Sequence, residues 1–284
     1  MLGLAYRMLG DFDEAEDVVQ EAYLRWQRSE QEAIRSPEAW LVTVVTRLAI
    51  DRLRRLDTER ANYPGPWLPE PIAIEASQLP SSGPAPNEST ELASDLSIAL
   101  LVLLESLRPE ERAAFLLREV FGTGYDEIAR ILERSQDAVR QMVHRAKERV
   151  HAGRPRHVLS PGEHEQMLEQ FRTALAADDA EGVLALLAPD VVLASDGGGR
   201  ARAARKPLVG RDRVSKFLLG VTRKSGQVYQ LTHLNGEPAL FALQDGMVVT
   251  AFSFEIDRTG IHAVHIMRNP DKLSHTMRLA APIV

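Results

Sequence analysis

The sequence contains no cysteine at any of its 284 positions. A chain without thiols cannot use a disulfide framework, thiol catalysis or a cysteine-based zinc site, and it is compatible with a reducing cytoplasm. No apolar run approaches the roughly 18 residues that a membrane-spanning helix needs. The first residues, Met1 to Arg7, resemble neither a signal peptide nor a transit peptide. These absences predict a cytoplasmic protein with no membrane partner.

Charge is segregated along the chain. The formal net charge is −6, which by itself argues weakly against a nucleic-acid partner. Residues 140–156, however, contain six Lys or Arg against one Glu, and residues 57–95 contain seven Asp or Glu against one Arg. A basic segment inside an acidic chain is the electrostatic signature of a nucleic-acid interface. A solvated helix face is the alternative explanation of the same charges.

Residues 1–56 are predicted to be helical. Hydrophobic residues make up 44% of the chain and charged residues 26%, as in a globular protein, and the length suggests two or three domains. Within residues 14–26 the apolar positions recur at helical spacing. Ser36-Pro37 then supplies an N-cap and a proline at the first helical position, which predicts a second long helix ending in a basic stretch near Arg55.

Periodicity stops between Asp57 and about Glu91, where seven prolines lie between positions 64 and 86. Such a composition predicts an extended linker and not a buried element. One part differs, because residues 63–71 place Tyr63, Trp67 and Leu68 in a proline frame. A segment stiffened in this way can dock on a surface at low entropic cost. A rigid spacer is the alternative.

Helices resume near Leu92 and continue to about Ala152. Residues 125–132 form a short predicted helix, Glu133-Arg134 a turn, and Ser135 caps a cationic helix over residues 136–150. This is a helix-turn-helix pattern, in which the start of the second helix enters the major groove. Its early side chains suit base edges and its later ones phosphates. A generic helical hairpin would show the same pattern.

The remaining residues predict an α+β domain. A Ser160-Pro161-Gly162-Glu163 capping box starts a helix that runs to about Ala176. Further helices are expected at 180–187 and 211–222, and strands at 190–194, 228–234, 239–243, 247–256 and 261–267. Asn235-Gly236 and Asp245-Gly246 between alternating apolar runs are strong hairpin signals. Helices first and an antiparallel meander afterwards are typical of the α+β class.

Three segments resemble parts of the extracytoplasmic-function (ECF) RNA polymerase sigma factors, of the sigma-70 family. Residues 13–21 are similar to the region 2 helix that grips the polymerase clamp, and residues 39–55 to the part of region 2 that melts and reads the −10 element. Residues 107–149 resemble region 4, which reads the −35 element. Their order, with a linker between them, makes the resemblance specific over roughly the first 150 residues. The chain begins almost directly at Leu4-Ala5-Tyr6, so the first helix looks shortened, through a misplaced start or a smaller apolar face.

The rest of the chain resembles a SnoaL-like, ketosteroid-isomerase-type cone, as in the sigma factors that carry a fused SnoaL-like extension. Three stretches mark it: Trp67-Leu68-Pro69-Glu70-Pro71, Asp196-Gly197-Gly198-Gly199-Arg200 and Asn269-Pro270-Asp271-Lys272-Leu273. In such proteins the extension touches the sigma part and tunes its activity in place of a separate anti-sigma factor. The resemblance implies that the residues of interdomain regulation are Trp67, Leu68, Pro69, Glu70, Pro71, Asp196, Gly197, Gly198, Gly199, Arg200, Asn269, Pro270, Asp271 and Lys272.

The resemblance also implies binding residues. The implied partners are core RNA polymerase, through its beta-prime clamp helices and beta flap, and promoter DNA. The polymerase-binding residues are Asp13, Glu16, Asp17, Gln20 and Glu21. The −10 residues are Arg47, Asp51, Arg52, Arg54 and Arg55. The −35 residues are Ser135, Gln136, Arg140, Gln141, His144, Arg145 and Lys147.

Cone folds also host isomerases, hydrolases and cyclases, so the chemistry must be judged from the residues. An isomerase needs a carboxylate base in an apolar pocket and an acidic donor opposite. The candidates are Asp196, Asp257, His233, His262 and His265. The glycine run after Asp196 suits a hinge or a close backbone contact better than a held base, and Asp271 and Lys272 suit a docking or capping turn. No catalytic residue, cofactor or metal is therefore predicted.

The sequence thus predicts a multidomain chain of two all-α sigma domains and one α+β SnoaL-like cone. The expected boundaries are 1–57 for region 2, 58–91 for the linker, 92–156 for region 4 and 157–284 for the regulatory domain. The predicted function is that of an alternative sigma factor modulated by its own C-terminal domain. The alternatives are a small-ligand sensor and a SnoaL-like enzyme that carries a DNA-binding module; a closed, mainly apolar pocket would favour the sensor.

Overall fold

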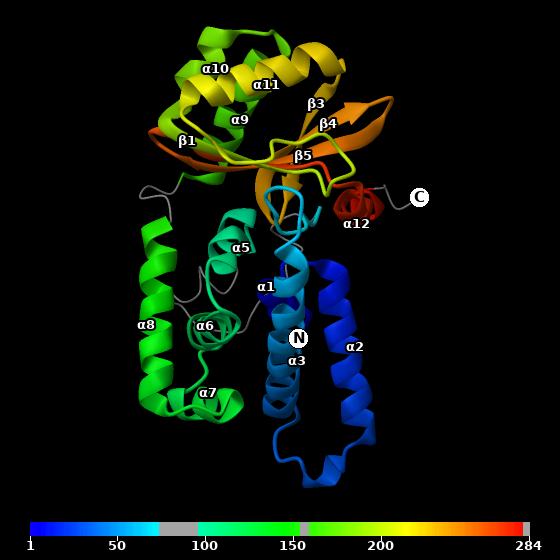
Figure 1. The fold of residues 1–284 in the computed structure, drawn as a ribbon, viewed down its shortest axis with the longest axis vertical. Helices are drawn as coiled ribbons and strands as arrows, with labels where there is room; N and C mark the ends of the chain where they lie inside the picture. The colour runs from blue at the N-terminus through cyan, green and yellow to red at the C-terminus, as the bar shows by residue number, and fades with distance from the viewer. Residues whose placement is uncertain (74–95, 154–158, 281–284) are drawn as a thin grey trace. The chain divides into compact units, whose positions relative to one another are not determined.

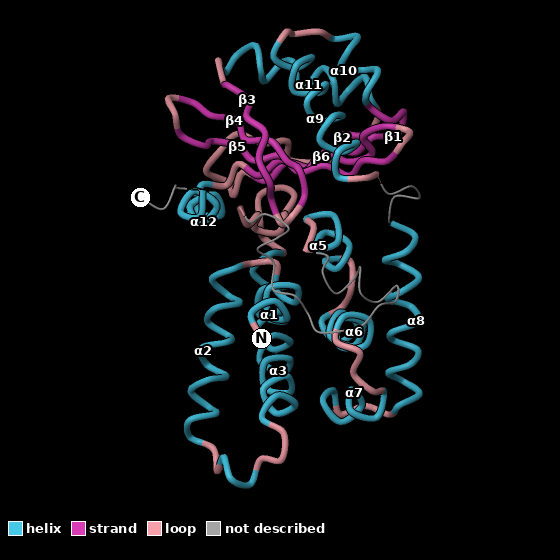
Figure 2. Tube along the Cα trace, turned by 180° about the vertical axis from the view of Figure 1, so that it is seen from behind, coloured by secondary structure: helices cyan, strands magenta, loops and turns pink. Residues whose placement is uncertain are grey.

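The computed structural model describes residues 1–73, 96–153 and 159–280. Their contacts divide the chain into two compact units (Figures 1 and 2). The first contains Met1–Asn62 and Leu100–Gly153, and the second contains residues 63–73, Ser97–Ala99 and the C-terminal part of the chain. In the described residues, no helix is both long enough and apolar enough to cross a bilayer.

The first unit is all-α, as predicted. Its elements are α1 (Leu2–Leu9), α2 (Phe12–Arg28), a short 3-10 helix (Gln31–Ala33), α3 (Pro37–Arg60), most of α5 (Ile98–Glu105), α6 (Pro109–Phe115), a π-helix (Leu116–Val120), α7 (Tyr125–Leu132) and α8 (Gln136–Gly153). α1, α2 and α3 pack together, and α1 buries Leu4, Tyr6, Met8 and Leu9. The predicted cap at Ser36 is confirmed, because its side chain accepts from Ala39 N.

The helix-turn-helix pattern is also confirmed. Glu133 adopts a left-handed conformation with φ +55° and ends α7, and the Ser135 hydroxyl accepts from Ala138 N at 3.2 Å at the start of α8. A core of buried apolar residues joins α6, α7 and α8, and Val42 of α3 packs against it. The pattern of apolar residues therefore orients the cationic face of α8 away from this core.

The second unit is a six-stranded sheet with helices on one face and a terminal helix. Its helices are α9 (Pro161–Ala176), α10 (Ala180–Leu186), α11 (Arg211–Ser225) and α12 (Pro270–Ala280), and its strands are β1 (Leu187–Asp196), β2 (Leu208–Val209), β3 (Val228–Leu234), β4 (Glu237–Gln244), β5 (Met247–Asp257) and β6 (Gly260–Met267). The strand order is β2-β1-β6-β5-β4-β3, with only β1 and β6 parallel.

The predicted hairpin turns are confirmed. Asn235 and Gly236 both have positive φ, as do Asp245 and Gly246, which is the geometry of a type I′ turn. α9, α10 and α11 cover one face of the sheet, and α12 lies on the other side (Figure 2). Phe171, Phe252 and Phe254 are among the buried residues of the core beneath the three helices. This arrangement is the α+β cone that the resemblance implied.

One prediction about this unit is wrong. Residues 270–280, where no helix was expected and Asp271 and Lys272 were expected to form a turn, form α12, and Asn269 just before it accepts from Asp271 N at 3.2 Å. The linker was predicted to be unburied except for residues 63–71, which could dock on a surface. Its described part, residues 63–73 (called the linker segment below), is docked in this way, with Leu68 3% exposed and Ile72 6% exposed inside the second unit. The rest of the predicted linker, residues 74–91, lies outside the described residues.

A partly buried histidine in α9 gives the second unit a predicted pH dependence. Burial lowers the pKa of His164 from 6.5 to about 4, and its Nε2 is buried without a hydrogen-bond partner. The stability that comes from keeping this ring neutral is therefore present above pH 6.5 and lost as the pH falls toward 4. Between pH 6.5 and pH 4, we expect the unfolding free energy of His164→Leu to fall by about 2 kcal/mol less than that of the unaltered chain.

Urea unfolding between pH 7 and pH 4 measures this change. Gln166→Leu, at an exposed position two residues along α9, is the matched control and should keep the steeper pH dependence of the unaltered chain. Equal slopes for His164→Leu and the unaltered chain would contradict the assignment to His164.

Candidate functional site

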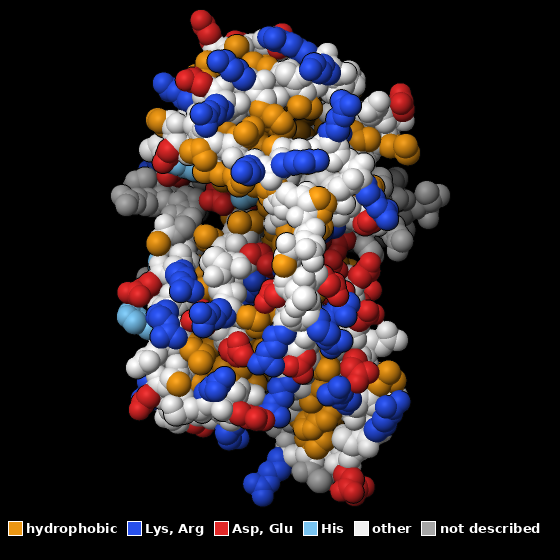
Figure 3. All heavy atoms as spheres, viewed as in Figure 1, with side chains coloured by type: hydrophobic (Ala, Val, Ile, Leu, Met, Phe, Trp, Pro, Cys, Tyr) orange, Lys and Arg blue, Asp and Glu red, His pale blue; other side chains and the backbone are white. Residues whose placement is uncertain are grey.

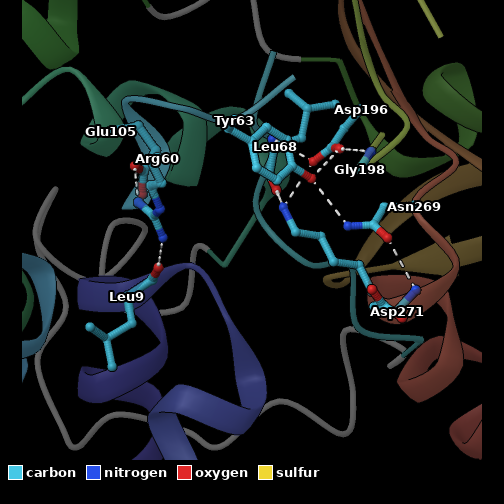
Figure 4. Close-up of polar contacts among 10 residues, drawn as sticks. Leu9, Arg60, Tyr63, Leu68, Glu105, Asp196, Gly198, Asn269 and Asp271 are labelled. Carbon is cyan, nitrogen blue, oxygen red and sulfur yellow. Dashed lines mark hydrogen bonds and ion pairs between the residues drawn. The ribbon is translucent and has the colours of Figure 1, made fainter. Parts of the chain in front are cut away.

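A buried carboxylate at the end of β1 organises the linker segment. Asp196 is 0% exposed, and its Oδ2 lies 2.8 Å from Lys272 Nζ and accepts from Leu68 N at 3.0 Å. Its Oδ1 accepts from Tyr63 OH at 2.6 Å and from Gly198 N at 3.0 Å. Figure 4 shows these groups converging on one carboxyl group. Because a buried charge is costly unless it is paired and hydrogen-bonded, every one of these partners matters for holding it.

Lys272 of α12 binds the linker segment from the other side. Its Nζ donates to the Leu68 carbonyl oxygen and lies 3.9 Å from the centroid of the Trp67 ring and 5.5 Å from that of Tyr63. The ammonium group therefore has a carboxylate, a carbonyl and two aromatic faces around it. The amide of Leu68 donates to Asp196, and its carbonyl oxygen accepts from Lys272, so both main-chain polar groups of Leu68 are bound.

Tyr63 and Asn269 belong to the same hydrogen-bond network around Asp196. Burial, together with the hydrogen bond to Asp196, raises the pKa of Tyr63, so its hydroxyl stays a donor at neutral pH. Asn269 Nδ2 donates to Tyr63 OH at 3.1 Å. The glycine run leaves room for this approach, since a Cβ on Gly199 would stand 2.9 Å from Pro64 Cγ of the linker segment.

The far end of the linker segment is held through its backbone. Ile72 N donates to Asn235 Oδ1 at 2.9 Å, and Asn235 N donates to the Ile72 carbonyl at 2.7 Å. Thr276 Oγ1 donates to the Pro71 carbonyl at 2.8 Å. The β3–β4 turn and α12 thus pair with main-chain groups that a proline-rich segment cannot satisfy by itself.

The structure brings together members of all three sequence marks: Trp67 and Leu68, Asp196 and Gly198, and Asn269 and Lys272. The glycine run after Asp196 was interpreted as a hinge or a close backbone contact. A Cβ on Gly199 would stand 2.9 Å from Pro64 Cγ, which fits the close contact, and the Asp196 carboxylate itself is buried and paired. Arg200 and Asp271 form an exposed ion pair at 2.7 Å. Sequence reasoning missed Asn235, which was interpreted only as a turn residue, and Thr276; no sequence signal distinguished Thr276.

A small cavity lies beside the linker segment and has room for about one water molecule. Leu68, Pro69 and Pro71 form part of its wall, and Ser253, His265 and Met267 of the sheet form another part. His265 is 7% exposed, its Nε2 lies 3.1 Å from Glu255 Oε1, and its Nδ1 is buried without a hydrogen-bond partner. A bridging water would satisfy that nitrogen.

The other enzyme candidates lie in separate pairs. Asp257 accepts from Thr259 and lies 2.8 Å from His262 Nε2; burial alone would raise the pKa of Asp257, but these hydrogen bonds lower it below its usual value. His233 pairs with Glu165 at 3.4 Å. Across the described part of the chain, no group of three or more His, Asp or Glu side chains could hold a metal ion.

The predicted −35 residues lie along α8. Arg140 is exposed and pairs with Asp137 at 3.3 Å, and His144 is 75% exposed. Arg145 and Lys147 reach Glu111 and Glu119 at 3.4 and 3.0 Å. Ser135 caps the helix, and Gln136 and Gln141 are exposed. The arrangement presents cationic and amide side chains on one face, which suits duplex DNA.

The predicted −10 residues lie on α3, and each has a partner within the first unit, either in α3 itself or in another helix. Arg52 forms an ion pair with Glu14 of α2, and Arg55 donates to the Asp51 carbonyl at 3.4 Å. Arg47 donates to the Ile131 carbonyl of α7, and Arg54 donates to Glu110 of α6. The predicted polymerase-binding residues Asp13, Glu16, Asp17 and Gln20 are exposed on α2, and Glu21 pairs with Arg25 at 2.8 Å.

Comparison with known proteins gives two family matches. Residues 1–59 match the model of sigma-70 region 2, and residues 97–150 match the model of sigma-70 region 4. Together these matches contain α1 to α3 up to residue 59 and α5 to α8 up to residue 150. The matched ranges contain the residues predicted to bind DNA and polymerase.

Similarity to relatives extends over most of the chain. The ECF RNA polymerase sigma factor SigJ of Mycobacterium tuberculosis is 37% identical over 84% of this chain and 76% of its own length. The probable ECF sigma factor SigI of the same species is 30% identical over 96% of this chain and 91% of its own. The crystal structure of SigJ superposes with a TM-score of 0.76 and 32% identity, covering 97% of this chain and 95% of that one. The chain therefore belongs to the ECF RNA polymerase sigma factors of the sigma-70 family.

Proposed function

We propose that this protein is an alternative sigma factor that binds core RNA polymerase, directs it to specific promoters, and is modulated in cis by its own C-terminal cone. The observation that carries the proposal is that Asp196 accepts from the amide of Leu68 and Lys272 donates to its carbonyl oxygen. A segment that follows region 2 directly is thereby fixed to a domain more than a hundred residues further along the chain.

The proposed contacts follow the sequence prediction. The exposed acids of α2 bind the beta-prime clamp helices of polymerase, and region 4 meets the beta flap. Cations of α3 bind −10 DNA, and those of α8 bind the −35 element, the early residues at bases and the later ones at phosphates. The protein works in the cytoplasm, where its polymerase is. The predicted domain boundaries belong to the same proposal.

Modulation in cis follows from tethering. Two DNA-binding modules gain avidity only when their spacing fits the promoter. While the linker segment is bound by the cone, its path is fixed, and the spacing is not free to adjust. Releasing the linker segment is a population shift that polymerase drives through its differential affinity for the released form. This device replaces a separate anti-sigma factor.

The cone is proposed to have no catalytic role. Asp196 is paired with Lys272, and Asp257 and His265 are engaged in separate pairs, so among these candidates, all within the described residues, no base stands opposite an acidic donor. The cavity beside Leu68 has room for about one water molecule, so a small ligand would need the linker segment to leave first. The hypotheses of an enzyme and of a ligand sensor are therefore less well supported than that of a regulatory domain.

Leu68→Asp tests the proposal. Leu68 is 3% exposed and its amide touches the Asp196 carboxylate, so the new side chain buries a second negative charge beside the first and releases the linker segment. We expect promoter-specific run-off product, made with core polymerase from the promoter upstream of the gene, to rise about tenfold. The control is Asn62→Asp, which adds the same charge at an exposed position just before the linker segment.

Product that is equal for the two variants and the unaltered chain would remove the regulatory part of the proposal and leave the sigma assignment. Absence of specific product from every version, with polymerase shown competent by another sigma factor, on other promoters as well, would count against the sigma function itself.

A further inference from the structure

Arg47 of α3 caps the end of α7. Its Nε donates to the Ile131 carbonyl at 3.0 Å, its Nη2 donates to the Arg130 carbonyl at 3.2 Å, and Nη2 also lies 3.1 Å from Glu133 Oε1. The last carbonyls of a helix have no partner within the helix and carry partial negative charge. A guanidinium from region 2 therefore completes the helix that begins the helix-turn-helix of region 4.

A second arginine of α3 reaches region 4 nearby. Arg54 Nη2 lies 2.5 Å from Glu110 Oε1, in the first turn of α6. The hydrogen bond that Arg54 donates to Glu110 raises the pKa of Arg54. Burial would raise the pKa of Glu110, but Arg54 lowers it below its usual value. Both groups are charged at neutral pH, and the contact is an ion pair between the two regions.

Buried contacts support the same closed arrangement. Arg112 of α6, 3% exposed, donates to the Met8 carbonyl at 2.6 Å, and Arg60 of α3 bridges Glu105 Oε2 at 2.7 Å and the Leu9 carbonyl at 2.9 Å. Figure 4 shows the Arg60 contacts. On the face drawn in Figure 3, basic and acidic side chains are interspersed over the helices of this unit. The two regions are thus joined along α3.

Arg47 and Arg54 are also among the residues that the proposed function assigns to −10 DNA. A guanidinium fork that already binds carbonyl and carboxylate oxygens has few donors left for phosphates. We infer that Arg47 and Arg54 latch region 2 to region 4 in the free protein, and that they exchange this internal partner for the phosphate backbone of promoter DNA when the regions separate. The inference rests on the proposed function for its DNA half only.

The strength of the latch suits this exchange. The side chains of Arg47 and Arg54 are 48% and 54% exposed, so each pair is weak by itself and is weakened further by salt. Polymerase and DNA can therefore replace these contacts. In the free protein, only the molecules in which the regions are apart can bind DNA through these arginines. Because this fraction is small, the apparent affinity for DNA is lowered in proportion to it.

Charge reversal at Glu110 tests the latch in the full chain. Glu110→Lys places a cation against Arg54. The matched control is Asp126→Lys, which makes the same change in the first turn of another region 4 helix, where the exposed Asp126 pairs only weakly with Arg130 of its own helix, at 3.7 Å. The chain has no cysteine, so Glu30→Cys and Glu148→Cys, both at exposed positions, accept a donor and an acceptor dye without competing sites.

We expect energy transfer between the dyes to fall in Glu110→Lys and to stay unchanged in Asp126→Lys at about 0.15 M salt. We also expect the free Glu110→Lys protein to bind a short fluorescein-labelled duplex about fivefold more tightly than Asp126→Lys, although both carry the same net charge. Circular dichroism of both variants checks that the helices are intact.

Equal energy transfer and equal duplex affinity in the two variants would overturn the latch, and promoter-specific run-off transcription by the same proteins would show that the proposed function still stands. A loss of energy transfer without tighter duplex binding would overturn the exchange with DNA. A failure of the unaltered chain in run-off transcription would instead count against the proposed function.

Discussion

Replacing Lys272 by methionine is expected to free the linker segment from the cone. The substitution keeps most of the side-chain length but removes the ammonium group that lies 2.8 Å from Asp196 Oδ2 and donates to the Leu68 carbonyl. The Asp196 carboxylate, 0% exposed, is left buried without a countercharge. Removing one partner of a buried ion pair costs about 3–5 kcal/mol, so the released fraction should rise by at least ~100-fold.

Chymotrypsin measures the release. It cleaves after Trp67, because the next residue is Leu68 and not proline, whereas Tyr63 is followed by Pro64. When opening and closing are fast, the cleavage rate follows the released fraction. Mass spectrometry separates this cut from those at the other aromatic residues. The control Arg223→Met breaks an ion pair with Asp178 whose side chains are 60% and 45% exposed, and it should change the rate by about twofold or less.

A second variant separates charge from packing. Asp196→Asn combined with Lys272→Met removes both charges and keeps an acceptor for Leu68 N, so cleavage should return part of the way to that of the unaltered chain. A rate for Lys272→Met no faster than for Arg223→Met would show that Lys272 does not hold the linker segment.

Elements that depend on local signals were predictable from the sequence. Ser135 caps α8, Ser160 caps α9, and Asn235-Gly236 turns the β3–β4 hairpin with positive φ at both residues. Each of these depends on residues within a few positions of one another, and the side-chain chemistry that favours them is the same in every protein. Apolar periodicity likewise placed most helices and strands near their observed bounds.

The linker segment illustrates what local signals miss. Residues 63–73 have no periodicity and many prolines, a composition usually found in solvated chain. Their burial depends on Asp196, Asn235 and Lys272, which lie far along the chain. These side chains form hydrogen bonds with backbone groups that a proline-rich segment cannot pair in a regular sheet. The resemblance to a family pointed to Trp67 and Lys272, but no pattern in the sequence shows that one touches the other.

The α3 arginines show the same limit for charge. A basic end on a helix predicts a phosphate-binding surface, and the sequence contains no sign that Arg47 faces the carbonyls of Ile131 and Arg130. Backbone carbonyls at a helix end are acceptors that any sequence provides, so they leave no mark in residue type. The packing of α3 on α7 decides which arginines of α3 bind groups within the protein, and this packing is defined only in the folded chain.

Gly198→Ala is expected to weaken linker binding about tenfold through a single methyl group. Gly198 has φ +59°, a conformation that costs an alanine about 1–2 kcal/mol. The added Cβ would also stand 2.6 Å from Oδ1 of Asn269. Asn269 must then move, and its Nδ2 loses the bond to Tyr63 OH that supports the hydroxyl on Asp196. Loss of such a bond is worth about 1 kcal/mol or more, because buried groups are left unsatisfied.

Gly226→Ala is a matched control for this glycine. Gly226 has the same φ of +59° at the end of α11, but a Cβ there would meet nothing within 4 Å. Both variants should therefore lower the melting temperature through the same backbone strain, while only Gly198→Ala should speed chymotrypsin cleavage after Trp67. If the two variants were cleaved at equal rates, the contact between Gly198 and Asn269 would have no part in holding the linker segment, and Asp196 and Lys272 alone would account for its binding.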